Sequence, residues 1–178
     1  MTIDNETVDA EFMDISSTTI RNADATFSSD VFMDIFTRAS GVVLLYDVAS
    51  LNSFEHITNQ AYMYVWMCKR YRGEVGSCEF VLVGNKADVL QTKPNLREVD
   101  KELAEQWAQS QGMKHFELTT HNREQVQEAV YALMRAIKRA RKRAEKERNE
   151  ESPRPKQTKT TSIRNKLATA IRKPPPST

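Results

Sequence analysis

Three polar side chains, Asn85, Lys86 and Asp88, follow the apolar run Phe80–Val83 and the glycine at position 84. The carboxylate of Asp88 can accept two hydrogen bonds from adjacent N–H groups, such as guanine offers at its ring nitrogen and exocyclic amine. The aliphatic stem of Lys86 can lie along a ring face with its ammonium in water. Asn85 can brace the loop or reach a ring carbonyl. The spacing therefore predicts recognition of a planar polar ring, with a solvated turn as the alternative.

Apolar runs without polar alternation predict the elements that hold this loop. The runs Val42–Val48 and Phe80–Val83 are typical of strands buried on both faces of a parallel sheet. Open α/β sheets bind ligands in the loops at the carboxyl ends of such strands. Helices are expected over residues 31–39, after the cap Ser50, from Val99 to Gly112, and after the capping pair Asn122 and Gln125. The pattern predicts an α/β fold with a doubly wound, mostly parallel sheet and helices on both faces.

The amino-terminal residues predict a half-exposed hairpin of two strands, Met1–Asp4 and Val8–Ile15, joined near Asn5. Partial alternation places Val8, Ala10 and Phe12 on one side of the second strand. Residues 16–30 are rich in Ser, Thr, Asn and Asp, which indicates a loop.

The string Asn85-Lys86-x-Asp88 resembles the guanine-specificity motif of Ras-like small GTPases. Thr119 and Thr120 follow a short strand and resemble, in part, the second guanine loop of that family. The resemblance covers about residues 1–140 and implies a small G-domain of the P-loop NTPase type. It implies signal transduction through GTP or GDP, with these five residues at the guanine base.

Asp14, at the end of the predicted hairpin, resembles the family aspartate that works near Mg²⁺. Ser17 and Thr18 stand where the family has the glycine and glutamine that serve hydrolysis. The 178 residues contain no Gly-x-x-x-x-Gly-Lys-Ser/Thr loop, so the family's first strand, phosphate loop and first helix are missing. We expect GTP hydrolysis to be impaired or absent, and a sheet that either has a gap or pairs the hairpin elsewhere.

Three explanations of the missing segment stay open: an amino-terminally shortened GTPase, a decayed relative used for binding, or a mis-specified start. The sequence thus leaves three functions. The first is a Ras-like GTP-binding protein in incomplete form, and the second is a non-catalytic pseudo-GTPase module. The third is an unrelated doubly wound domain, for example flavodoxin-like, in which Asn85 and Asp88 are loop residues.

Charge divides the chain unevenly. Residues 135–178 hold 15 Lys and Arg against 4 Asp and Glu, whereas residues 1–134 hold 11 against 20. We predict a partial G domain over 1–148 and a disordered basic tail over 149–178, which contains five prolines. Residues 135–178 suit an anionic membrane surface, and nucleic acid is a weaker alternative because basic residues and aromatics are not interleaved.

Cys68 and Cys78 are the only cysteines, which gives no disulfide framework and favours a reducing compartment. No cysteine follows Cys78, so we expect no prenylation of this chain, and the first residues lack a signal-peptide pattern. The expected location is the cytoplasm, with a peripheral position on the inner face of the plasma membrane. Protein effectors or regulators are the other partners that the resemblance implies.

Overall fold

The computed structural model describes residues 2–16, 29–71 and 78–151. The chain forms two units, residues 1–143 and 144–178. The predicted loop at 16–30, with Ser17 and Thr18, and the tail beyond Glu151 lie almost wholly outside the described residues. In the second unit, residues 144–150 are helical and exposed, with an ion pair of 3.8 Å between Lys146 and Glu150.

Among the described residues, three parallel strands form the central sheet in the order β3 (Gly41–Asp47), β4 (Glu79–Asn85) and β5 (Lys114–Glu117). The two predicted strand runs are thus confirmed as neighbours. In the register, Leu44 lies opposite Leu82 and Asp47 lies opposite Asn85. Because all three strands run the same way, their carboxyl ends meet at one edge of the sheet.

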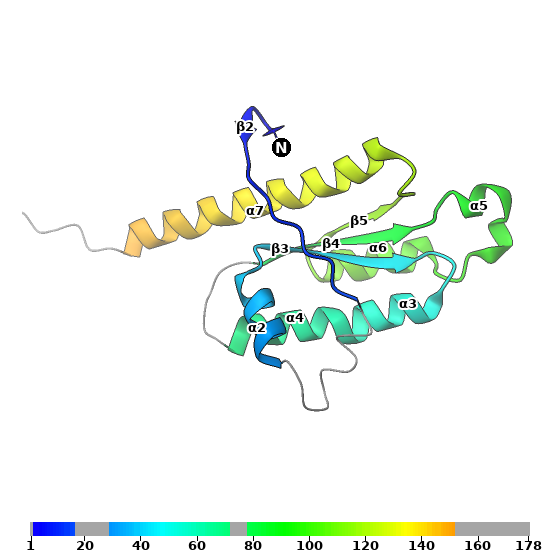
Figure 1. Ribbon diagram of the computed structural model, residues 1–178, viewed down its shortest axis with the longest axis horizontal. Coiled ribbons are helices and arrows are strands. Elements are labelled where there is room, and N and C mark those ends of the chain that lie inside the picture. Colours follow the sequence, from blue (N-terminus) through cyan, green and yellow to red (C-terminus); the bar gives the residue numbers. More distant parts are fainter. Residues whose placement is uncertain (1, 17–28, 72–77, 152–178) are drawn as a thin grey trace, which may run out of the picture. The chain divides into compact units, whose positions relative to one another are not determined.

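Helices cover both faces of this sheet (Figure 1). One face packs against α7 (Arg123–Glu151), through Val81 and Val83 of β4 and the α7 residues Ala129, Leu133 and Ile137. The other face packs against α3 (Leu51–His56) and α6 (Lys101–Ser110), where Leu44, Tyr46 and Leu82 meet Phe54, Ala104 and Ala108. Alternate side chains of β4 therefore enter two separate cores, as a strand buried on both faces requires. In β3, Leu44 and Tyr46 enter one core, whereas Val43 and Leu45 on the other face are exposed, so the prediction that this strand is buried on both faces is wrong. The doubly wound architecture is confirmed.

The helix that follows Ser50 is a single run built from α3, a π-helical turn at Ile57–Ala61 and α4 (Tyr62–Tyr71). Ser50 caps it as predicted, because its hydroxyl accepts a hydrogen bond of 3.3 Å from the Ser53 amide. Trp107 of α6 packs edge-on against Phe54 and Tyr62 at the border of this core. Among the described helices, none has a stretch long and apolar enough to cross a membrane.

Helix α2 (Ser29–Arg38) lies beside α4, where Phe36 packs against Val65 and Cys68. Lys69 of α4 donates hydrogen bonds to two carbonyl oxygens at the end of α2, those of Thr37 at 2.6 Å and Ala39 at 2.5 Å. An ammonium from α4 thus caps the carboxyl end of α2, where a cation is favoured by the helix dipole.

The amino-terminal hairpin is much shorter than predicted. It pairs β1 (Thr2–Ile3) with β2 (Glu6–Thr7), and residues 8–16 have no regular secondary structure. Asp4 and Asn5 form a two-residue turn with positive φ at both positions, of 50° and 64°. This turn fixes the register so that the second strand begins at Glu6. The predicted strand Val8–Ile15 is therefore wrong, and Phe12 is 65% exposed.

The hairpin forms its own sheet and does not extend the parallel one. Two ion pairs hold it against α7: Asp4 with Arg135 at 3.0 Å and Glu6 with Lys138 at 2.7 Å. No strand of the described residues pairs with the outer edge of β3. Val43 and Leu45, on that strand, are 41% and 49% exposed.

The remaining elements at the carboxyl edge are short. Helix α5 (Val89–Thr92) and the 3-10 turn η2 (Pro94–Leu96) follow β4 and lead to α6. Helix α6 ends at Ser110, two residues before the predicted stop at Gly112, whose φ of +74° is a left-handed conformation that glycine adopts readily.

Candidate functional site

Two loops meet at the carboxyl edge of the sheet, one after β4 and one after β5. The Leu118 amide donates to the Gly84 carbonyl at 2.8 Å, and the Ala87 amide donates to the Leu118 carbonyl at 3.2 Å. These backbone bonds bring the Asn85–Asp88 loop against the start of the Thr119–Thr120 loop. The two predicted guanine-side segments are thus adjacent in space, although Lys86 and Thr119 are 33 residues apart in the sequence.

The side-chain oxygen Oδ1 of Asn85 is buried and has no hydrogen-bond partner among the described residues. The Asn85 backbone is fixed, because its carbonyl accepts a bond of 3.1 Å from the Val48 amide. A buried acceptor without a donor costs about 1–3 kcal/mol. Such a group needs an explanation, and a ligand that supplies an N–H is one.

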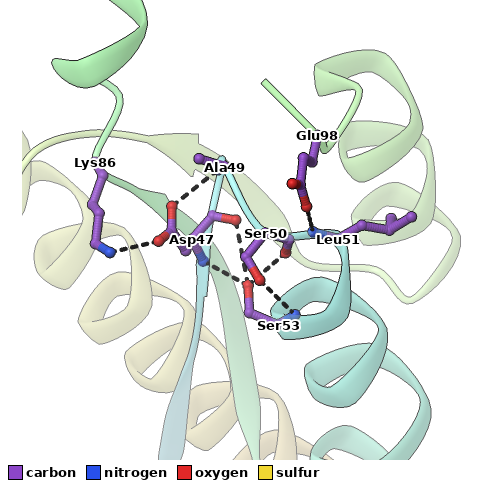
Figure 2. A network of polar contacts seen from close by, with 7 residues as sticks. All are labelled: Asp47, Ala49, Ser50, Leu51, Ser53, Lys86 and Glu98. Atoms are coloured by element: carbon purple, nitrogen blue, oxygen red, sulfur yellow. Dashed lines mark hydrogen bonds and ion pairs between the residues drawn. The ribbon is translucent and has the colours of Figure 1, made fainter. Parts of the chain in front are cut away.

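Lys86 has φ of +65°, a left-handed conformation that turns the chain sharply out of β4. Its ammonium does not lie free in water as the sequence suggested, because it pairs with Asp47 at 2.5 Å (Figure 2). This hydrogen bond raises the pKa of Lys86. Partial burial raises the pKa of Asp47, but Lys86 and the Ala49 amide lower it by more, so that both groups stay charged.

The end of β3 that carries Asp47 is itself held in place by hydroxyl groups. Figure 2 shows Ser53 between Asp47 and Ser50: its Oγ accepts from the Asp47 amide at 3.0 Å and donates to the Ser50 carbonyl at 2.7 Å. The carboxylate of Glu98 also accepts a hydrogen bond of 2.9 Å from the Leu51 amide. The turn from β3 into α3 is therefore rigid, and it presents Asp47 to Lys86.

Asp88 precedes α5 at the N-cap position, where an aspartate usually accepts a hydrogen bond from the helix. Its side chain makes no such capping bond. The carboxylate is therefore not used by the helix that it begins, which suits a group reserved for a ligand.

Within the second loop, Thr119 is held by its neighbours and Thr120 is exposed. The Thr119 amide donates to Gln125 Oε1 at 3.4 Å, and the Thr119 hydroxyl accepts from the His121 amide at 3.3 Å. One of the two hydrogen bonds of the predicted capping pair is present. The Gln125 amide donates to Asn122 Oδ1 at 3.2 Å, so Asn122 caps α7. The Gln125 side chain returns to Thr119 and not to Asn122, so it fixes the loop.

A bidentate ion pair supports this loop from below. Arg97 donates to the two carboxylate oxygens of Glu117 at 2.7 and 2.9 Å, and also to the Val99 carbonyl at 3.0 Å. Burial raises the pKa of Glu117, but Arg97 lowers it by more. Glu117 thus ties the end of β5 to the segment between η2 and α6.

The sequence model of the Ras family matches residues 26–139, which is more than half of the chain. The chain belongs to the Ras family. The match does not reach the hairpin, although the sequence resemblance was expected to cover residues 1–140.

Curated Ras-related proteins are similar to part of the chain. Rab-13 from Bos taurus is 30% identical over 115 residues, 65% of this chain and 52% of that protein. RABG1 from Arabidopsis thaliana is 40% identical over 89 residues, 49% and 41% of the two chains. Rab-27B from Homo sapiens is 32% identical over 100 residues, 56% and 41%. The chain spans about half the length of the curated relatives that it matches.

Guanine nucleotides with Mg²⁺ are the ligands of Ras family members, and the described residues fit the base better than the metal. The Asn85 oxygen without a partner and the Asp88 carboxylate that does not cap α5 both lie in the Asn85–Asp88 loop, which adjoins the Thr119–Thr120 loop. Asp14, by contrast, is exposed in the segment 8–16. Within residues 2–16, 29–71 and 78–151, no three His, Cys, Asp or Glu side chains gather in a group that could hold a metal ion. No step through Mg²⁺ follows from these residues.

Sequence reasoning missed Asp47, Ser53 and Arg97, which position the Ras-type loops. Asp47 carried a signal, since it ends a buried strand run at the edge where ligands bind. Ser53 and Arg97 carried none, because their partners are determined by the fold and not by local spacing.

Proposed function

We propose that this chain binds the guanine base specifically. It forms the base-binding part of a Ras-type nucleotide site. Asp88 accepts from the ring N–H and the exocyclic amine, the stem of Lys86 lies on the ring face, and the loop at Thr119 and Thr120 offers amides to the ring carbonyl. The observation that carries the proposal is the buried, unpartnered Asn85 oxygen beside these groups. Because Asp47 holds the Lys86 ammonium, the lysine stem is placed before any ligand arrives.

Hydrolysis is the family activity, and we propose that it is weak or absent here. Thr18 stands at the position of the glutamine that orients the attacking water, and Ser17 at that of a phosphate-contacting glycine. The described residues add no cradle of phosphate ligands, so binding energy comes chiefly from the base. The chain would then discriminate between bases more sharply than between GTP and GDP.

Titration of the chain with GDP, GTP and ADP, followed by NMR shifts or calorimetry, tests this function. Guanine nucleotides should shift the NMR signals of the Asn85–Asp88 and Thr119–Thr120 loops, and ADP should leave these signals unchanged. Asp88→Ala should weaken guanine binding roughly ten- to hundredfold, the equivalent of about 1.5–3 kcal/mol for a hydrogen bond to a charged group. Asp9→Ala is the matched control, since it removes the same charge from an exposed position in the segment 8–16. Equal affinity of these loops for ADP, or an equal loss in the control, refutes the proposal.

A second candidate function is that of a non-catalytic interaction module, with protein effectors or regulators as partners. Three large apolar side chains on one side of α4 favour it: Met63, Trp66 and Met67 are each more than two fifths exposed. The guanidinium of Arg70 lies over the Trp66 ring at 5.2 Å, which keeps the ring in place. Pull-down with Trp66→Ala against the wild type, with nucleotide binding measured in parallel, separates the two functions.

We also propose that residues 135–178 attract the chain to an anionic surface such as the inner face of the plasma membrane, which places it in the cytoplasm. The excess of Lys and Arg in this region supports the idea. Pelleting with phosphatidylserine vesicles should fall steeply as salt rises. Pelleting that salt does not change, or none, refutes it, and stronger binding to RNA than to vesicles favours nucleic acid.

A further inference from the structure

A cleft of about 220 Å³ lies at the end of the sheet opposite the two guanine-side loops, where β4 and β5 begin. Its floor is formed by Phe80, Val81 and Met113. Helix α7 forms one wall with residues that recur at helical spacing: Ala132, Leu133, Ala136, Arg139 and Arg143. The volume equals about seven water molecules at roughly 30 Å³ each. This is enough for a phosphate group with part of the molecule that carries it.

Three cations line this cleft against one acid. Lys114 of β5 and Arg139 of α7 form no ion pair or hydrogen bond with any described residue. Arg143 approaches Glu79 at 3.9 Å, which is too long for a hydrogen bond. The lining therefore has a net charge of +2, with the Glu79 carboxylate offsetting one of its three cations.

Three other cations on the same part of α7 form ion pairs or hydrogen bonds. Arg135 is paired with Asp4, Lys138 is paired with Glu6, and Arg141 donates to the Ser40 hydroxyl at 2.9 Å. Arg139, which lines the cleft, has no such partner among the described residues, and the same holds for Lys142, which is exposed and does not line the cleft. Cations held around a concave surface concentrate positive potential, which raises the local concentration of anions.

We propose that this cleft binds a phosphate-bearing anion, through Lys114, Arg139 and Arg143. Arginine and lysine are the side chains that recognise phosphate oxygens, and two guanidinium groups allow bidentate contacts. The open space at Gly112, where an added Cβ would meet no atom within 4 Å, leaves the mouth of the cleft wide enough for such a group. The ligand class is a compact polyphosphate, either free in solution or displayed on a lipid headgroup.

Calorimetric titration with inorganic pyrophosphate tests the site in the full chain. Arg139→Ala and Lys114→Ala should each weaken binding about tenfold or more, as expected for loss of a charge-assisted hydrogen bond. Lys142→Ala is the matched control, because it removes a cation from the same helix at an exposed position that does not line the cleft. Ala136→Leu leaves the charge unchanged and fills the cleft, and it should abolish binding.

The two sources of the phosphate are separated by parallel titrations. Inositol trisphosphate is the soluble probe, and phosphatidylcholine vesicles that contain phosphatidylinositol bisphosphate are the lipid probe. Binding that depends on Arg139 with the vesicles assigns the cleft to a headgroup, and with the soluble probe alone it assigns a free polyphosphate. Absence of binding to all three probes overturns the proposal. So does an equal loss in Lys142→Ala, or unchanged affinity in Ala136→Leu, since either result means a diffuse field and no site.

Discussion

Gly84 lies in β4 directly before Asn85, and it is next to Tyr46, the aromatic side chain with the lowest exposure among the described residues. A Cβ at this position would lie 2.7 Å from the Tyr46 hydroxyl oxygen, 2.8 Å from Tyr46 Cζ and 3.0 Å from Val48 Cγ1. Tyr46 is 2% exposed and Val48 is fully buried, so neither can move into solvent. The Tyr46 hydroxyl is also fixed by a hydrogen bond of 2.9 Å to His115 Nε2.

Gly84→Ala is therefore expected to lower the free energy of unfolding by about 2 kcal/mol. Overpacking a filled core costs about 1–3 kcal/mol, and displacement of the Tyr46 hydroxyl from His115 adds about 1 kcal/mol. The smaller entropy of the unfolded alanine variant offsets about 0.4–1 kcal/mol. For a chain of this size the midpoint of thermal unfolding should fall by about 4–8 °C. Urea unfolding should show a lower midpoint and an unchanged slope.

A double-mutant cycle with Tyr46→Phe tests the cause, because phenylalanine lacks the closest contact atom. Gly84→Ala should cost about 1 kcal/mol less in the Tyr46→Phe background than in the wild type. Gly112→Ala serves as the control: nothing crowds its Cβ, but its positive φ costs about 1–2 kcal/mol irrespective of residue 46. The reasoning fails if Gly84→Ala is neutral, or if its cost is the same in both backgrounds.

Three further changes test the groups that support the loops. Glu117→Gln should lower the free energy of unfolding by about 1.5–3 kcal/mol at neutral pH. Arg97 lowers the pKa of Glu117 in the folded state. The stability that the wild type gains from this ion pair is therefore fully present above the unfolded pKa, near 4.5, and is lost as pH falls through the folded pKa. The urea unfolding curves of wild type and variant should then converge in acid. Asp47→Asn should weaken GDP binding with little change in the urea midpoint, because it releases Lys86 at an exposed position; an unchanged affinity contradicts the role given to this pair. Ser50→Ala should cost about 1 kcal/mol in urea unfolding through loss of the cap, and a neutral result would remove the cap from the account.

Much of the sheet could be predicted from the sequence, because buried parallel strands are encoded locally. Val42–Val48 and Phe80–Val83 are apolar without alternation, and each is followed by polar residues where its strand ends. The same locality explains why the caps Ser50 and Asn122 were found, since a cap and its amide are three residues apart. The placement of Asn85 and Thr119 in neighbouring loops follows from parallel strand order alone.

The hairpin could not be predicted in this way. Its length is set by the left-handed turn at Asp4 and Asn5, and its position by ion pairs to Arg135 and Lys138, more than 120 residues away. A weak alternation over 8–15 indicates a strand only where a partner strand exists, and no described strand pairs with that segment.

The contact of Lys69 with the end of α2 has a consequence for chemical modification of the chain. The Lys69 ammonium donates to the carbonyl oxygens of Thr37 and Ala39 at the end of α2. Acetylation removes the charge of this amine, so both hydrogen bonds would be weakened together. The segment released runs directly into Gly41, the first residue of β3. A neutral Lys69→Gln variant should then show faster amide exchange at Thr37 and Ala39 while the middle of α4 remains protected, so that a single acyl group would loosen one helix from its neighbour without unfolding either core.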